Sequence, residues 1–160
     1  MRDPDDALRE HLIDNLDGEN AHRGFAGIAQ DWPSELRGTR PDDLPHSGWE
    51  LVEHLRLAQR DILDFWQDPG YTAPDWPDGY WPDEREPPSD DAWDASLQQF
   101  DDDLATLKSL IRETADLHAE IPHGSGQTYL REALVVADHN AYHLGQLVTV
   151  RRLLGAWPPG

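Results

Sequence analysis

Apolar residues recur every three or four positions along much of the chain, a spacing that places them on one face of an α-helix. The clearest series is Leu51, Val52, Leu55, Ala58, Ile62 and Phe65. It follows the stretch SGWE, in which Ser47 and Glu50 fit a capping box, where a hydroxyl and a carboxylate satisfy each other's free backbone donors. The pattern therefore predicts a helix from Ser47 to near Gln67, which ends before Pro69.

A helix is also expected at the start of the chain, in DPDDALREHLIDNL. Asp3 suits the N-cap and Pro4 the first helical position of this segment. We expect Gly18 to interrupt the helix and the stretch NAHRGFAGIAQDW to resume it up to Pro33. The first helix is thus predicted to be kinked near Gly18.

Two longer helices are predicted in the second half of the chain, over about 90–121 and about 127–154. The apolar residues of the earlier one alternate in steps of four and three, as in the seam of a helical bundle: Trp93, Leu97, Phe100, Leu104, Leu107 and Ile111. No segment shows a convincing strand pattern. The length of 160 residues fits one domain. We therefore predict a single all-α domain over residues 1–160.

A connection rich in proline and aromatic residues, DPGYTAPDWPDGYWPDEREPPS, covers residues 68–89. Loops of this length are uncommon in compact domains unless they are functional or disordered. The aromatic residues argue against disorder, because disordered segments contain few of them. Two interpretations stay open. The connection is either an ordered strap or a lid, and as a lid it would place Trp76, Tyr80 and Trp81 around a substrate pocket.

The composition limits the class of protein. No apolar run approaches the roughly 18 residues of a membrane span, and MRDPDD lacks the apolar core of a signal peptide. A cytoplasmic protein without a membrane partner is therefore expected. The chain has no cysteine, which excludes disulfides, thiolate metal ligands and a cysteine nucleophile. Any thiol chemistry would need a thiol from outside.

The formal net charge is −19, from 32 acidic and 13 basic residues. Such a surface repels phosphate backbones and anionic lipids, so no nucleic-acid partner is expected. Our hypothesis is that the acidic excess is an adaptation to a salty cytoplasm, where repulsion between carboxylates is screened. Indifference of the helical signal to salt concentration would contradict it.

Two histidines stand one helical turn apart in ADHNAYHLGQL, residues 137–147. At about 100° per residue, His139 and His143 share a face with apolar residues and are expected to be buried. Buried imidazoles need partners, because an unsatisfied polar group costs roughly 1–3 kcal/mol. From the residues alone, three interpretations stay open: a pair of metal ligands, two core histidines satisfied by hydrogen bonds, or an acid/base pair.

A metal site would need a further ligand from another helix. His54 fits best, because it flanks the apolar series of the 47–67 helix. His46 precedes the Ser47 cap on a loop, and His22 follows the expected break at Gly18. The remaining histidines are expected at the surface or at helix ends: His11, His118 and His123.

The stretches HSGWELVEHLRLAQRDIL and ADHNAYHLGQLVTVRRLLGAW resemble the DinB/YfiT-like superfamily, and the resemblance extends over nearly the whole chain. It implies a four-helix bundle in up-down-down-up order, with residues 68–89 as the long crossover between the second and third helices. It also implies a metal held by His54, His139 and His143. The members commonly form homodimers, and the superfamily includes thiol-dependent transferases.

The function expected from this resemblance is that of a metal-dependent enzyme of transferase or hydrolase type, acting on a small molecule. A low-molecular-weight thiol is a candidate co-substrate. The metal is expected to be Zn²⁺, Ni²⁺ or Fe²⁺, which all accept imidazole ligands. Glu50 and Asp61, on the helix of His54, are the candidates for carboxylates that hydrogen-bond the metal-binding imidazoles. The alternative is a non-catalytic bundle that binds a ligand or holds a structural metal.

Overall fold

The computed structural model describes residues 3–18 and 20–158, and these residues are helical, without a strand, apart from one isolated β-bridge between Glu120 and Thr128. Their α-helices are α1 (Pro4–Asp17), α2 (Phe25–Ala29), α3 (Gly48–Gln67), α4 (Asp90–Glu113) and α5 (Tyr129–Leu153). Two short 3₁₀ helices, η1 (Ser34–Leu36) and η2 (Asp78–Tyr80), lie in the connections. The prediction of an all-α chain is confirmed. Among the described helices, none is both long and apolar enough to cross a membrane.

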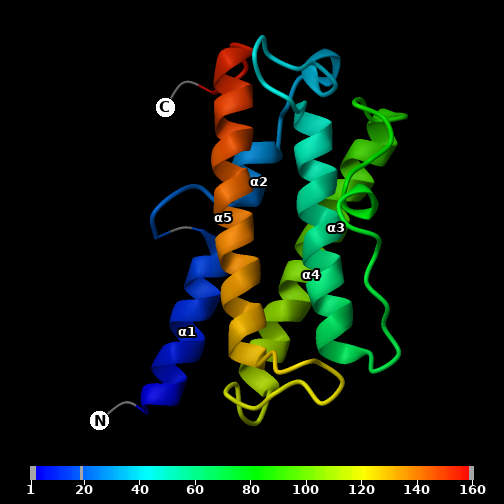
Figure 1. The fold of residues 1–160 in the computed structure, drawn as a ribbon. Helices are drawn as coiled ribbons and strands as arrows, with labels where there is room; N and C mark the ends of the chain where they lie inside the picture. The colour runs from blue at the N-terminus through cyan, green and yellow to red at the C-terminus, as the bar shows by residue number, and fades with distance from the viewer. Residues whose placement is uncertain (1–2, 19, 159–160) are drawn as a thin grey trace.

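The long helices α1, α3, α4 and α5 enclose the core (Figure 1). Both α3 and α1 pack against α4 and against α5, while the short α2 rests on the same two helices. The residues between them are almost completely buried, among them Leu51, Leu55, Trp93, Phe100, Leu107 and Leu147. Burial of this apolar surface is the main force that holds α3 and α5 side by side.

The start of α3 is fixed by the capping box that the sequence predicted. The Ser47 hydroxyl accepts a hydrogen bond from the Glu50 backbone N–H at 3.2 Å, and the Glu50 carboxylate accepts one from the Ser47 N–H at 2.8 Å. The Ser47 hydroxyl also donates to the carbonyl of Arg85 at 2.5 Å, which ties the end of the 68–89 connection to this cap. The cap thereby sets the position of His54, two turns into the helix.

The prediction of one kinked helix up to Pro33 is wrong. Helix α1 ends at Asp17, because Gly18 adopts the left-handed conformation (φ 74°) and caps it. Only Phe25–Ala29 returns to helix. At the end of this helix, the buried guanidinium of Arg151 donates to the carbonyls of Ile28, Gln30 and Asp31, which occupies oxygens that a continuing helix would use.

The prediction of a helix up to Ile121 is also wrong, because α4 ends at Glu113, before an extended Thr114. The following residues form a loop whose backbone pairs with the start of α5: the Ile121 N–H donates to the Gln127 carbonyl at 2.8 Å. Leu117 and Ile121 are buried all the same. Because these two apolar residues continue the helical spacing, the sequence pattern extended past the end of α4.

Residues 68–89 follow the side of α3 in Figure 1, and η2 packs against that helix. The Tyr71 hydroxyl donates to the carboxylate of Asp61 on α3 at 2.7 Å, and Tyr80 is buried. The connection is therefore an ordered segment that carries two of its aromatic side chains to one region of α3.

Candidate metal centre

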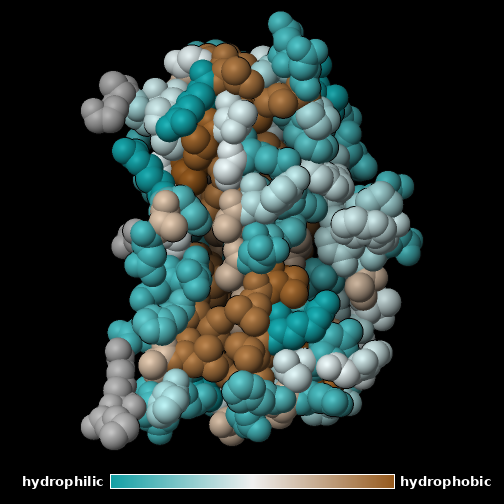
Figure 2. All heavy atoms as spheres, turned by 60° about the vertical axis from the view of Figure 1, so that its left-hand side comes forward, coloured by the Kyte–Doolittle hydropathy of each residue, from teal (hydrophilic) through white to brown (hydrophobic). Residues whose placement is uncertain are grey.

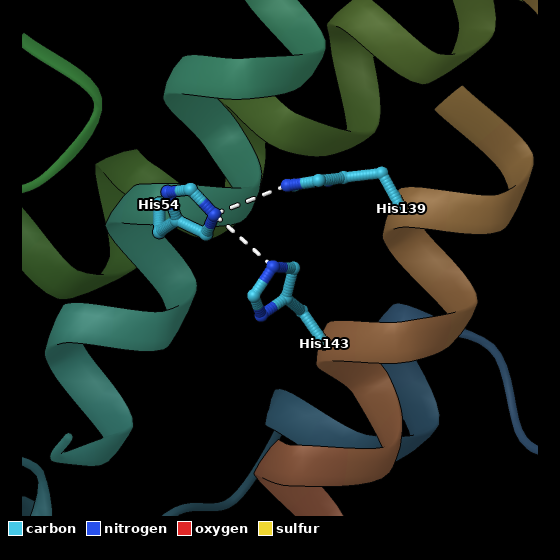
Figure 3. Close-up of side chains that lie close together, drawn as sticks. All are labelled: His54, His139 and His143. Carbon is cyan, nitrogen blue, oxygen red and sulfur yellow. Dashed lines mark hydrogen bonds between the residues drawn. The ribbon is translucent and has the colours of Figure 1, made fainter. Parts of the chain in front are cut away.

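Three imidazoles meet between α3 and α5 (Figure 3). His54 comes from α3, and His139 and His143 come from successive turns of α5. The Nε2 atom of His54 lies 3.1 Å from Nε2 of His143 and 3.1 Å from Nε2 of His139. One nitrogen from each ring lies within 4.8 Å of the others, so the three rings could hold a single metal ion.

His54 is 4% exposed, and contacts on two sides hold its ring in place. Its Nδ1 lies 2.8 Å from the carbonyl oxygen of Tyr80, which can only accept a hydrogen bond. The ring of Trp81 stacks on the imidazole at 3.9 Å between centroids, with an angle of 2° between the planes. The connection between α3 and α4 therefore orients a side chain of α3.

His143 has a comparable support from its own helix. Its Nδ1 lies 2.6 Å from Oε1 of Gln146, one turn further along α5. The ring of Tyr142 meets the imidazole edge-on, at 4.9 Å between centroids. The amide oxygen of Gln146 accepts the ring N–H, so Nε2 points away from Gln146 toward His54.

These contacts determine where the ring protons lie. His54 and His143 each use their Nδ1–H as a donor, so in the neutral rings both Nε2 atoms carry a lone pair and no proton. Burial lowers the pKa of His54, and burial lowers that of His143 to about 4. Near pH 7 two bare nitrogens thus face each other at 3.1 Å. A shared cation would turn this repulsion into attraction, so the residues fit a divalent metal ion.

The third ring, His139, is half-buried, and burial lowers its pKa to about 4. Its Nδ1 and the neighbouring Oδ1 of Asn140 are both buried and have no hydrogen-bond partner among the described residues. The Asn140 amide donates to Oε1 of Gln59 at 3.0 Å, and the Gln59 amide donates to the carbonyl of Phe100 at 2.8 Å. These buried amides link α5, α3 and α4 directly beside the imidazoles.

The other histidines lie outside this group. His46 stacks on Trp81 at 4.1 Å, so it contacts the ring that covers His54 without joining the three nitrogens. His22 is exposed, and its Nδ1 lies 2.9 Å from the carbonyl of Arg23. His11 and His118 are exposed as expected, whereas His123 is half-buried with its Nε2 2.6 Å from the carbonyl of Phe65.

The expectation that Glu50 and Asp61 support the ligands is wrong. The carboxylate of Glu50 accepts hydrogen bonds from Arg40 and from the Ser47 N–H, and that of Asp61 accepts one from Tyr71. Neither carboxylate bonds an imidazole of the group. Glu50 belongs to the helix cap and Asp61 to the anchoring of the connection, so their charges are used in holding the fold.

The three aromatic residues expected around a pocket are placed differently from one another. Trp81 stacks on His54, and Tyr80 contributes its backbone carbonyl to the same imidazole. Trp76 is 78% exposed and contacts the ring of Tyr80 at 5.5 Å. The structure therefore brings Trp81 and Tyr80 to the three histidines and leaves Trp76 at the surface of the connection.

Sequence reasoning missed the groups that orient the imidazoles. Gln146 could have been found, because it follows His143 by three residues and so lies over the next turn of the same helix face. The Tyr80 carbonyl had no signal, since a backbone oxygen 26 residues from His54 is identified only by the path of the loop. The contact of Asn140 with Gln59 joins two helices that are distant in the sequence, so no local pattern indicates it.

Comparison of the chain with curated proteins and with solved structures gave no match. One family model matches, described as the DinB superfamily, and it covers residues 18–147. This range is well over half of the 160 residues and includes all three histidines of the candidate metal centre. The chain therefore belongs to the DinB superfamily.

Proposed function

We propose that the protein is a metal-dependent enzyme that acts on a small molecule at the centre formed by His54, His139 and His143. One observation carries this proposal: the Nε2 atoms of His54 and His143 lie 3.1 Å apart, with Nε2 of His139 at the same distance from Nε2 of His54. Hydrogen bonds at the Nδ1 atoms hold two of the rings in this arrangement. Such outer contacts are typical of histidines that bind metal.

Three imidazole nitrogens suit Zn²⁺, Ni²⁺ or Fe²⁺. Catalytic zinc sites commonly have three protein ligands, whereas structural zinc sites have four. The ion, when bound, would act as a Lewis acid that lowers the pKa of a water or of a thiol. The chain has no cysteine, so a thiol co-substrate would be a low-molecular-weight compound. We infer a reaction of transferase or hydrolase type.

Residues of the connection form one wall of the proposed site. Trp81 covers one face of His54, and the Tyr80 carbonyl holds that ring at Nδ1. Trp81 also stacks on His46, so an apolar aromatic layer separates this side of the centre from solvent. Exclusion of water on this side strengthens the electrostatic interactions inside the site. Trp76 would contribute through its contact with Tyr80.

We infer that the long helices form one domain over residues 1–160, a four-helix bundle in up-down-down-up order. The length of the 68–89 connection supports this order, because two consecutive helices that run in the same direction need a connection that returns along the bundle. The path of the connection beside α3 supports it as well (Figure 1). The short α2 is an addition to the bundle between α1 and α3.

We further propose that the protein forms a homodimer through the exposed face of the N-terminal half of α5. Leu134 is 51% exposed there, and Val135 is exposed as well. Figure 2 shows hydrophobic side chains gathered along this side of the molecule. Asp138 is the one acidic residue in 134–153, although the chain has 32. Two copies would therefore meet here with less repulsion than elsewhere. Sedimentation should show that Leu134→Glu dissociates the dimer while Thr106→Glu, on exposed α4 surface, does not.

The enzyme proposal is tested with metal-loaded protein and a panel of electrophiles and small thiols. Turnover that requires metal and is lost in His139→Ala would support an enzyme. The second candidate is a structural metal, because ligands from α3 and α5 would link these two helices. Unchanged chemistry together with a large fall in melting temperature in His139→Ala would favour this structural metal and contradict the enzyme.

A further inference from the structure

A cavity of about 210 Å³ lies beside the metal centre, between the segment that precedes α3 and the C-terminal half of α5. Leu44, Leu51 and Val150 form its apolar surface. His46 lines it from the loop, and Tyr142, Gly145 and Gln146 line it from α5. At Gly145 no atom lies within 4 Å of the point that a Cβ would occupy, so the missing side chain leaves the cavity open.

Residues of the cavity wall contact the groups around the three histidines. The Oε1 atom of Gln146 accepts the Nδ1–H of His143 at 2.6 Å, and Tyr142 meets the same imidazole edge-on. His46 stacks on Trp81, which in turn stacks on His54. A molecule in the cavity would therefore be separated from the proposed metal ligands by one layer of side chains.

The lining indicates the charge of the ligand. No lysine, arginine, aspartate or glutamate lines the cavity, although 28% of the chain is charged. A charged ligand would lose its hydration there without an ionic partner, which disfavours both anions and cations. Among the lining residues, Gln146 offers the clearest polar contact. Its Oε1 faces His143, and its Nε2 has no hydrogen-bond partner among the described residues, so the N–H can donate to an oxygen.

The volume indicates the size of the ligand. An apolar cavity of about 150 Å³ is large enough to bind benzene. At about 210 Å³, this cavity can hold one ring with a short substituent. We propose that the cavity is a ligand site beside the metal centre, and that its ligand is an uncharged, single-ring compound with a carbonyl or hydroxyl oxygen. This ligand preference goes beyond the proposed function and can be measured without metal.

Three probes of the same shape and different charge test this preference: benzamide, benzoate and benzamidine. Binding is followed by amide chemical shifts in two-dimensional NMR, with metal-free and with Zn²⁺-loaded protein. We expect benzamide to shift the signals of Gly145, Gln146 and Thr149. Benzoate and benzamidine should bind more weakly by about tenfold or more, because the burial of an unpaired charge is unfavourable.

Two variants localise the effect. Gly145→Leu should abolish benzamide binding, because the new side chain enters open space in the cavity and displaces nothing. Ala141→Leu places the same side chain on the exposed surface of α5 one turn away and should leave binding unchanged. Zn²⁺ content of both variants is measured in parallel and should equal that of the wild type.

The proposal is overturned if none of the probes binds at millimolar concentration, if a charged probe binds as well as benzamide, or if Gly145→Leu binds benzamide normally. Failure of the proposed metal centre gives a different result: the protein would take up no Zn²⁺, while benzamide would still bind.

Discussion

The Nε2 atoms of His54 and His143 lie 3.1 Å apart, and the opposite nitrogen of each ring donates to an oxygen that can only accept. The two rings belong to α3 and α5, whose packing depends on the buried residues of the core. The unfavourable contact between two lone pairs is thus imposed by the fold. A divalent cation bound between the two nitrogens would relieve this contact.

Gln146→Leu should weaken metal binding by about 10- to 100-fold, the usual effect of removing an outer partner of a metal-binding histidine. The reason is that Oε1 of Gln146 holds the His143 tautomer that leaves Nε2 free. Isothermal titration with Zn²⁺ measures the change. Gln146→Glu keeps an acceptor and should retain affinity. Thr149→Val, further along the same face, serves as the control. Equal affinity of Gln146→Leu and wild type would contradict this role of Gln146.

The metal-free protein should lose stability as the pH falls from about 6.5 to about 4. In the unfolded chain a histidine binds a proton near pH 6.5. In the folded chain burial lowers the pKa of both His139 and His143 to about 4. Between these values the unfolded state holds more protons, so acid favours unfolding, and the full contribution is present above about pH 6.5.

Melting temperatures of the metal-free protein across this pH range measure the effect. The double variant His139→Gln/His143→Gln lacks the two titrating groups and should show a smaller loss between pH 6.5 and pH 4. If the wild type and the double variant lose stability equally over this range, these two imidazoles do not account for the acid sensitivity.

Arg151→Met should destabilise the protein by about 3 kcal/mol or more, because four backbone carbonyls, among them the buried one of Ile28, would lose a charged donor. The guanidinium of Arg151 is buried and donates to the carbonyls of Ile28, Gln30, Asp31 and Ala156. Urea unfolding gives the free energy. Arg152→Met changes the exposed neighbour and should have a much smaller effect. Similar losses in the two variants would show that the carbonyl contacts of Arg151 contribute little.

Local signals predicted the parts of the structure that depend on neighbouring residues. The SGWE stretch located the first turn of α3, where Ser47 and Glu50 form the predicted capping box. The four-residue spacing of His139 and His143 placed both rings on one side of α5, and the structure brings His54 to them. These features follow from helix geometry, which repeats every 3.6 residues and can be read from a sequence.

Features that depend on distant contacts could not be predicted in this way. The carbonyls of Gln30 and Asp31, beyond α2, are bonded by Arg151, more than a hundred residues away. The apolar Leu117 and Ile121 fit a helical pattern, but they are buried by a loop that pairs with the start of α5. The stacking of Trp81 on His54 similarly depends on how the 68–89 connection returns along α3.

The most direct test of the central claim is the metal stoichiometry and coordination of the purified protein, loaded with Zn²⁺ near neutral pH. We predict one tightly bound ion per chain and, by X-ray absorption, imidazole nitrogens at roughly 2.0–2.1 Å. His54→Ala, His139→Ala and His143→Ala should each lose the ion, while His22→Ala, which changes an exposed histidine outside the group, should retain it. Wild-type protein that binds no more metal than the three variants would contradict the account.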